Sequence, residues 1–280
     1  MSTLIMGVVN VTPDSFSDGG RFLDPAAAIA HGLRLRAAGA HLLDVGGEST
    51  RPGSERVDPA VEQERVIPVV QALAEVGAAV SVDTMNASTA LAAVAAGARI
   101  VNDVSGGLAD PDMLPAVAGT GADLVLGHWR GPSADMYAHA QYDDPVRDVL
   151  SELASRIEAA AVAGIPPARL ITDPGIGFGK KGDQNWTVLR GLPRLVALGP
   201  RVLVGTSRKR FLAETLGLDQ PDAQDVETRR DLATAVTSVL AAQAGVWAVR
   251  VHDVTATRDA LRIAAKWEDE ERWTSPTRSH

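Results

Sequence analysis

Cysteine is absent from this sequence, which excludes disulfide bonds, thiolate catalysis and thiolate metal ligation. Long uninterrupted apolar runs are also absent, and no charged leader precedes an apolar segment. We therefore expect a soluble, cytoplasmic protein with no export signal and no membrane partner. Basic residues are not in excess, and the net charge of −8 argues against a nucleic-acid partner. An anionic small-molecule substrate would need a local cluster of Lys and Arg.

Aromatic residues are scarce, at 4% of the chain, although hydrophobic residues make up 45%. A core of the size this chain permits must therefore be built from Ala, Val, Leu and Ile. The length of 280 residues fits one large α/β barrel, a fold that typically needs about 250 residues. Because no segment reads as a linker, we expect a single domain across residues 1–280, with a frayed, charged tail from about residue 269.

Short apolar runs alternate along the whole chain with Ala-rich segments of helical character. The runs are dense in Val, Ile and Leu with little polar alternation, which indicates strands buried on both faces, as in parallel sheets. Eight such units favour a closed (β/α)8 TIM barrel of class α/β over an open doubly wound sheet. The expected strands lie near residues 4–10, 40–45, 79–83, 99–104, 123–128, 169–173, 201–206 and 247–254.

Polar residues stand at or near the carboxyl end of every expected strand. In a barrel these ends converge on one mouth. Any single one of them is equally well explained by a helix cap or a loop hydrogen bond. Eight in register favour a functional site. They are Asn10, Asp44, Asp83, Asn102, His128, Asp173, Ser207 with Lys209, and Arg250 with His252.

The chemistry of these strand ends suits an anion beside a flat polar ring. Arg250 and His252 are two residues apart on a strand, so they share a face and can present two donors to one anion. Asp83, Asn102 and Asp173 provide acceptors and one amide, which suit a heterocycle with several N–H donors, such as an aminopyrimidine. Paired carboxylates also suit acid–base catalysis or a metal ion.

A glycine-rich segment follows the sixth expected strand, with Gly177, Gly179 and Gly182 in G-x-G-x-x-G spacing. A dinucleotide fold would need an acidic residue at the end of the next strand, but that strand runs into Ser-Arg-Lys at 207–209. A phosphate-binding Walker loop is excluded because Pro174 stands where its first glycine would be. The six histidines show no metal-ligand spacing such as H-E-x-x-H.

Seven sequence blocks resemble the dihydropteroate synthase family, in the family's order, between residues 6 and 254. One departure is Gly127, where the family pattern leads us to expect a methionine before His128. The blocks are MGVVNVTPDSFSDGG from Met6, DVGGESTRPG from Asp44, SVDT from Ser81, VNDVSGG from Val101, DPGIGFGK from Asp173, GTSRKRF from Gly205 and RVHDV from Arg250.

This resemblance implies a transferase of folate biosynthesis that joins 6-hydroxymethyl-7,8-dihydropterin pyrophosphate to 4-aminobenzoate. The products would be 7,8-dihydropteroate and pyrophosphate. It further implies a homodimer, a Mg2+ cofactor and competition by sulfonamides. The first and second loops would close over the mouth, and we expect Thr12 to Gly20 to be poorly ordered without substrates.

The resemblance also implies a role for individual residues. The pterin would be held by Asp83, Asn102, Asp173 and Lys209, and the pyrophosphate by Asn10, Arg250 and His252, with the metal at Asn10. The 4-aminobenzoate site would be bordered by Thr50, Arg51, Pro52, Phe178, Ser207 and Lys209. The catalytic groups would be Asp18, Asp173, Lys209, Arg250 and His252.

Two other functions fit part of the pattern. Folate-dependent corrinoid methyltransferases are similar barrels that bind a pterin in the same mouth, but they need no pyrophosphate site, so the basic groups at 207–209 and 250–252 favour the synthase. A non-catalytic paralogue would retain the pterin site without turnover. Product formation from both substrates separates all three.

Overall fold

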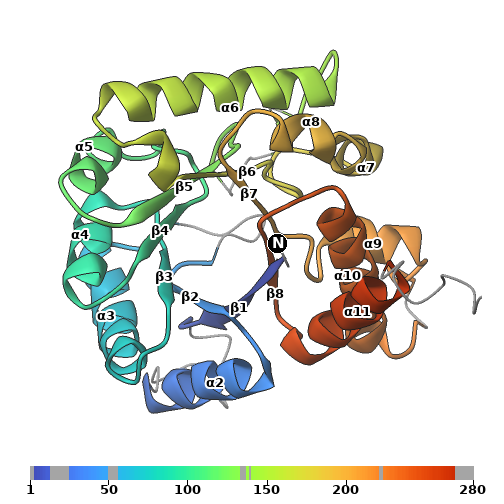
Figure 1. Cartoon of the computed structure of the whole chain (residues 1–280), viewed down its shortest axis with the longest axis horizontal. Coiled ribbons are helices and arrows are strands. Elements are labelled where there is room, and N and C mark those ends of the chain that lie inside the picture. Colours follow the sequence, from blue (N-terminus) through green and yellow to red (C-terminus); the bar gives the residue numbers. More distant parts are fainter. Residues whose placement is uncertain are drawn as a thin grey trace, which may run out of the picture.

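A closed barrel of eight parallel strands organises the chain, as the sequence predicts (Figure 1). The computed structural model describes residues 3–12, 25–49, 56–132, 137–138, 140–220 and 223–268. Each strand pairs with its neighbours in sequence, and β8 pairs with β1 to close the ring. The strands are β1 (Leu4–Asn10), β2 (Leu42–Gly46), β3 (Val80–Asp83), β4 (Ile100–Asp103), β5 (Asp123–Gly127), β6 (Leu170–Asp173), β7 (Arg201–Val204) and β8 (Ala248–Val251).

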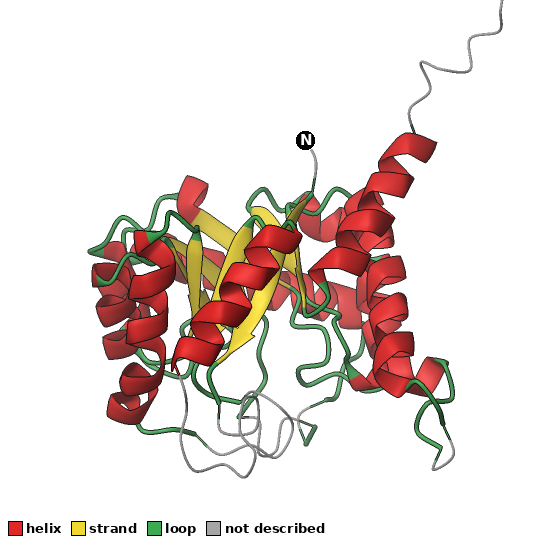
Figure 2. Cartoon of the chain, turned by 90° about the horizontal axis from the view of Figure 1, so that it is seen from below, coloured by secondary structure: helices red, strands yellow, loops and turns green. Residues whose placement is uncertain are grey.

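Helices cover the outside of this barrel (Figure 2). Several begin with proline at the first helical turn, where its missing N–H costs nothing, and with an aspartate cap. Asp58 accepts from the amide of Ala60, and Asp144 from that of Val146. The helices are α2 (Pro25–Ala38), α3 (Pro59–Glu75), α4 (Ala87–Ala95), α5 (Met113–Ala118), α6 (Pro145–Val162), the 3-10 turn η1 (Pro167–Arg169), α7 (Asp183–Arg190), α8 (Leu192–Val196), α9 (Arg210–Thr215), α10 (Val226–Gln243) and α11 (Val254–Trp267).

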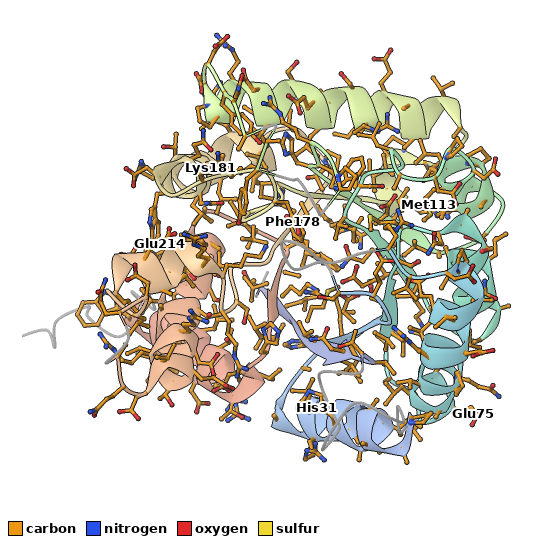
Figure 3. All side chains as sticks on the ribbon, turned by 180° about the vertical axis from the view of Figure 1, so that it is seen from behind. His31, Glu75, Met113, Phe178, Lys181 and Glu214 are labelled. Atoms are coloured by element: carbon orange, nitrogen blue, oxygen red, sulfur yellow. The ribbon has the colours of Figure 1, made fainter. Side chains whose placement is uncertain are left out.

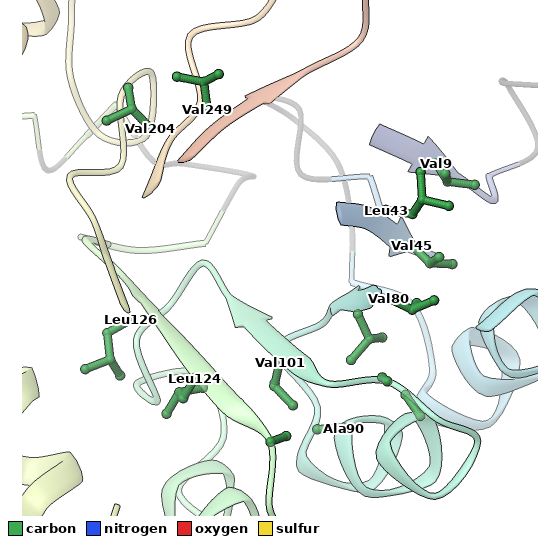
Figure 4. Packing of buried hydrophobic residues seen from close by; sticks show 14 of the residues in the cluster. Val9, Leu43, Val45, Val80, Ala90, Val101, Leu124, Leu126, Val204 and Val249 are labelled. Carbon is green, nitrogen blue, oxygen red and sulfur yellow. The ribbon is translucent and has the colours of Figure 1, made fainter. Parts of the chain in front are cut away.

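Two hydrophobic cores lie on the two sides of the sheet. The larger packs outward-facing strand residues such as Val9, Val45 and Val80 against the helices (Figure 4). The smaller contains Met6, Leu42, Ile100, Val125, Ile171, Leu203 and Ala248. Since side chains alternate along a strand, residues two positions further on face the same side. Four of those positions are polar: Asp44, Asn102, Asp173 and Arg250. The apolar inner layer therefore supports a polar layer at the carboxyl ends of the strands.

Two expected strands extend two or more residues past the carboxyl ends of the observed ones. The seventh ends at Val204 and the eighth at Val251, rather than at 206 and 254. The eighth stops early because Asp253 caps α11, its side chain accepting from the amide of Ala256 at 2.9 Å. His252 therefore lies beyond the strand. None of the helices in the described ranges is long and apolar enough to cross a membrane.

Candidate active site

One guanidinium joins two buried carboxylates of different strands at the mouth. Arg250 donates from Nε to Asp44 Oδ2 at 2.6 Å and from a terminal nitrogen to Asp83 Oδ2 at 2.8 Å. Asn102 donates to the same oxygen of Asp44 at 3.0 Å. Side chains of β2, β3, β4 and β8 thus meet, although Asp44 and Arg250 are 206 residues apart in sequence. The structure brings together Asp83, Asn102 and Arg250 as expected and adds Asp44, to which the family pattern gave no role.

Charge in this cluster is unbalanced, because one cation serves two acids. Burial raises the pKa of Asp83 to about 7, and the nearby charge of Asp44 adds to this, while Arg250 works against it. Burial opposes charge on Arg250, but Asp44 and Asp83 raise its pKa, so it remains a cation. The cluster keeps a surplus of acceptor oxygens, which suits a ligand with several N–H donors.

A second pair of opposite charges combines β6 with the turn after β7. Lys209 donates to the carbonyl of Ile176, and its Nζ lies 4.7 Å from the ring centre of Phe178. Burial lowers the pKa of Lys209 to about 8, opposed by Asp173, and burial raises the pKa of Asp173, opposed by Lys209. Phe178 lies near the middle of the barrel in Figure 3, while its neighbour Lys181 lies farther out. Lys209 therefore lies near Phe178 and interacts electrostatically with Asp173, while the roles expected for the three residues stay predictions.

Ser207 and His252 form a third group. Ser207 Oγ lies 2.8 Å from His252 Nδ1 and accepts from the His252 amide at 3.0 Å. Arg250 and His252 thus take different partners, although their spacing predicts a shared face. The cause is the early end of β8 at Val251.

A buried lysine that the sequence did not single out lies behind the glycine-rich loop. Lys180 is 1% exposed, and its Nζ donates to the carbonyls of Gly175 at 2.9 Å and Phe178 at 3.1 Å. The same nitrogen lies 3.0 Å from Nδ1 of His128, whose Nε2 lies 3.0 Å from a carboxylate oxygen of Glu152. Burial lowers the pKa of Lys180 to about 7 and that of His128 to about 4. His128, expected at the mouth, instead lies buried between Lys180 and Glu152.

Gly127, the departure from the family pattern, has a steric reason. A Cβ at this position would lie 2.4 Å from the carbonyl oxygen of Val104 and 2.6 Å from its Cα. The backbone after β4 therefore passes where a methionine side chain would begin. This position and the path of that backbone are coupled, because a larger residue would require the segment around Val104 to move.

The remaining predicted residues are not in these clusters. Asn10 ends β1, is partly exposed and pairs in register with Gly46 of β2. The described residues contain no group of three or more His, Asp or Glu that could hold a metal ion. Asp18, Thr50, Arg51 and Pro52 lie outside the described residues, as do the tail from residue 269 and, apart from Thr12, the proposed lid from Thr12 to Gly20. Their assignments stay predictions.

Comparisons with known proteins agree with this geometry. The family described as "Pterin binding enzyme" matches residues 6–252. A dihydropteroate synthase of Mycobacterium leprae is 52% identical over 269 residues, covering 94% of this chain and 93% of the relative. The structure of Xanthomonas albilineans dihydropteroate synthase with 4-aminobenzoic acid superposes with a TM-score of 0.87 at 45% identity, covering 96% of this chain and 94% of that one. The same enzyme in complex with 7,8-dihydropteroate gives 0.80 at 40% identity, with the same coverage. The chain therefore belongs to the pterin binding enzyme family and, within it, to the dihydropteroate synthases, transferases of folate biosynthesis.

Proposed function

We propose that the barrel mouth condenses 6-hydroxymethyl-7,8-dihydropterin pyrophosphate with 4-aminobenzoate to give 7,8-dihydropteroate and pyrophosphate. The observation that carries this is the acceptor-rich cluster in which Arg250 joins Asp44 and Asp83 beside Asn102. An aminopyrimidine ring has N–H donors that can bond to the surplus acceptor oxygens of this cluster. The Xanthomonas albilineans relative solved with 4-aminobenzoic acid and with 7,8-dihydropteroate supports the same two substrate halves.

The pterin lies, in this proposal, between the two charged groups of the mouth. Asp83 and Asn102 meet its donor edge from β3 and β4, and Asp173 meets it from β6. Lys209 supplies the opposite charge. It interacts electrostatically with Asp173, and its Nζ lies over the Phe178 ring. A flat ligand is then held at its edges by polar groups on rigid strands, which fixes its exocyclic carbon relative to the second substrate.

Catalysis consists mainly of stabilising charge. Pyrophosphate leaves with the C–O bonding pair from a carbon beside an electron-rich ring, so bond breaking can precede attack. The arylamine nitrogen then supplies the pair for the new C–N bond and releases a proton. Arg250 and His252 lie at the mouth to receive the departing anion, while Asp173, with Asp18 of the first loop, favours the pterin cation. The neutral arylamine needs positioning by Phe178, Ser207, Lys209 and residues 50–52 rather than a strong base.

Mg2+ fits this site only as an ion carried with the pyrophosphate. The ligand assigned to it among the described residues is the side-chain oxygen of Asn10, which is partly exposed at the end of β1. Mg2+ in phosphate sites commonly takes one or two protein ligands and keeps several waters. Asn10, with Asp18 nearby in the sequence, would hold it there. When bound, the ion would supply charge neutralisation of the leaving group.

A second copy of this chain is the proposed partner. Leu232, Val236 and Leu240 recur every four residues on α10, and Ile263 and Trp267 do so on α11. All five side chains are more than half exposed. The two helices pack against each other at one side of the barrel (Figure 1). Exposed apolar side chains on two packed helices, called the apolar stripe below, suit a twofold helix-pair interface. Sulfonamide competition and a cytoplasmic location stay predictions.

The test is direct. Purified protein is mixed with the pterin pyrophosphate, 4-aminobenzoate and Mg2+, and dihydropteroate and pyrophosphate are quantified. Equal molar amounts of both products are expected. Pterin binding without any product would overturn the synthase proposal in favour of a binding paralogue. Methyl transfer from a methylated folate to a corrinoid would overturn it in favour of the related barrel enzymes.

A further inference from the structure

Three consecutive residues after β7 take three different directions. Ser207 bonds to His252 beyond β8, and Lys209 reaches the carbonyl of Ile176 in the loop after β6. Arg208, between them, turns away from the mouth toward α10. The sequence suggests a cationic group at 207–209 serving the ligand. The structure instead separates Arg208 from the two residues that face the mouth.

The backbone at Arg208 is held in an unfavourable conformation. Its φ is +57°, and among the described non-glycine residues only Asp225 shares a positive value. The carbonyl of Thr206 accepts from the Lys209 amide at 3.1 Å, which closes a tight turn with Arg208 at its third position. Glycine or asparagine usually occupies that position when φ is positive. Such a conformation persists in other residues only where the surroundings fix it.

Side chains of α10 provide that fixation. Asp231 accepts two bonds from Arg208, at 2.7 and 2.8 Å, in the parallel geometry that orients a guanidinium most strongly. Glu227 lies 2.7 Å from the third guanidinium nitrogen. The hydroxyl of Thr234, which is almost fully buried, accepts from the Arg208 amide at 3.2 Å. Both the side chain and the main chain of Arg208 are therefore tied to one 18-residue helix.

We propose that Arg208 is a positioning residue, whose clamp on α10 fixes the turn that aims Ser207 and Lys209 together into the mouth. The inference rests on the proposed function, because it assigns those two residues to the arylamine side of the reaction. Glycine would adopt the same turn without strain but would leave it free to rearrange. Arginine keeps the strained turn in one orientation, since α10 binds both its guanidinium group and its backbone amide.

The main experiment compares Arg208→Gly with wild type and with Arg210→Met. Arg210 is a matched control, because its ion pair with Glu214 lies on the exposed surface of α9. Arg208→Gly should fold with a melting temperature within about 3 °C of wild type, since relief of strain offsets part of the lost ion pair. Its kcat/KM for 4-aminobenzoate should fall on the order of tenfold to a hundredfold. Arg210→Met should retain wild-type kinetics.

A second variant protects the test against misfolding. Asp231→Asn keeps the arginine and the turn but removes the charged acceptor, so it should cause a smaller defect of the same kind. The double variant should be no worse than Arg208→Gly alone, because both changes break one clamp. Wild-type kinetics in folded Arg208→Gly, or fully additive effects in the double variant, would overturn the proposal.

Hydrogen exchange separates this inference from the proposed function. The Lys209 amide should exchange faster in Arg208→Gly and in Asp231→Asn than in wild type or Arg210→Met, whether or not the protein forms dihydropteroate. Unchanged exchange at Lys209 would contradict the clamp by itself. A wild-type protein with slow exchange and no turnover would contradict only the proposed reaction.

Discussion

Nζ of Lys180 lies 3.0 Å from Nδ1 of His128, and this contact ends a series of polar contacts that begins at Glu152 on α6. Although burial opposes it, bonds from His128 and Arg130 lower the pKa of Glu152 to about 2, so Glu152 is a carboxylate. A carboxylate beside Nε2 of His128 keeps the ring proton there, which leaves Nδ1 as an acceptor. Lys180 then has three acceptors for its three ammonium protons: this nitrogen and the carbonyls of Gly175 and Phe178.

Removing the Lys180 ammonium should therefore destabilise the protein. In Lys180→Met the side chain has a similar shape, but two buried loop carbonyls and one buried ring nitrogen lose their hydrogen-bond donor. We expect a loss of about 3 kcal/mol in unfolding free energy, measured by urea denaturation. The exposed neighbour Lys181 is the control, and Lys181→Met should stay within about 0.5 kcal/mol of wild type. Equal stability of the two variants would contradict the assigned network.

Asp83 predicts how pterin binding depends on pH. Its pKa is raised to about 7 by burial and by Asp44, so the acceptor carboxylate is lost as the pH falls below 7. Affinity for free pterin should then decrease roughly tenfold per pH unit between pH 7 and 5. Titration calorimetry across this range measures it. In Asp83→Asn the dependence should flatten, and a dependence that survives this change would assign the titration to another group.

The same pKa has the opposite effect on stability without ligand. The folded protein holds the Asp83 proton up to about pH 7, whereas the unfolded chain releases it near the ordinary aspartate pKa of 3.8. Between these values the folded state binds more protons, so this residue makes the free protein less stable as the pH rises. Asp83→Asn should remove that contribution, and thermal unfolding at pH 5 and 8 should show a smaller difference than in wild type.

Arg250 predicts a separation between two ligands. Its guanidinium is paired with the carboxylates of both Asp44 and Asp83, and we assign it to the leaving group. Arg250→Met should weaken binding of inorganic pyrophosphate on the order of tenfold to a hundredfold, as loss of a charge-assisted contact does. Free pterin should bind with less change, because Asn102 and Asp173 remain. Arg262→Met, on the exposed face of α11, is the control. Equal weakening of both ligands in calorimetry would exclude the assigned role.

The barrel and most of the site follow from alternation and strand order. Apolar runs fixed the eight strands to within a few residues, and polar side chains two positions after the inner apolar layer identify the mouth. Asp44 is among the polar strand ends that the sequence identifies, because it follows Leu42 at that spacing, but the family pattern assigned it no ligand. Its contact with Arg250 could not be predicted, since only the closed ring brings β8 near β2.

The surroundings of Arg208 and Lys180 depend on local backbone geometry. Spacing alone groups Arg208 with Ser207 and Lys209, but a left-handed turn directs it to α10. Nothing in the sequence singles out Lys180, because lysine is seldom buried without partners. Its three acceptors exist only once the loop after β6 has folded against His128. Neither the turn nor this loop leaves a periodic signal in the sequence.

The apolar stripe on α10 and α11 predicts a dimer that one charge can disrupt. Val236 lies midway between Leu232 and Leu240 on the exposed face of α10, so a twofold interface would bury a charge placed there. Val236→Glu should change the sedimentation of the protein from dimer to monomer at micromolar concentration, because an unpaired buried carboxylate costs several kcal/mol of association. Val162→Glu is the matched control: Val162 is 84% exposed at the end of α6, on another part of the barrel. This variant should remain dimeric. A wild-type monomer, or a dimer that tolerates glutamate at 236, would show that the stripe has a different occupant.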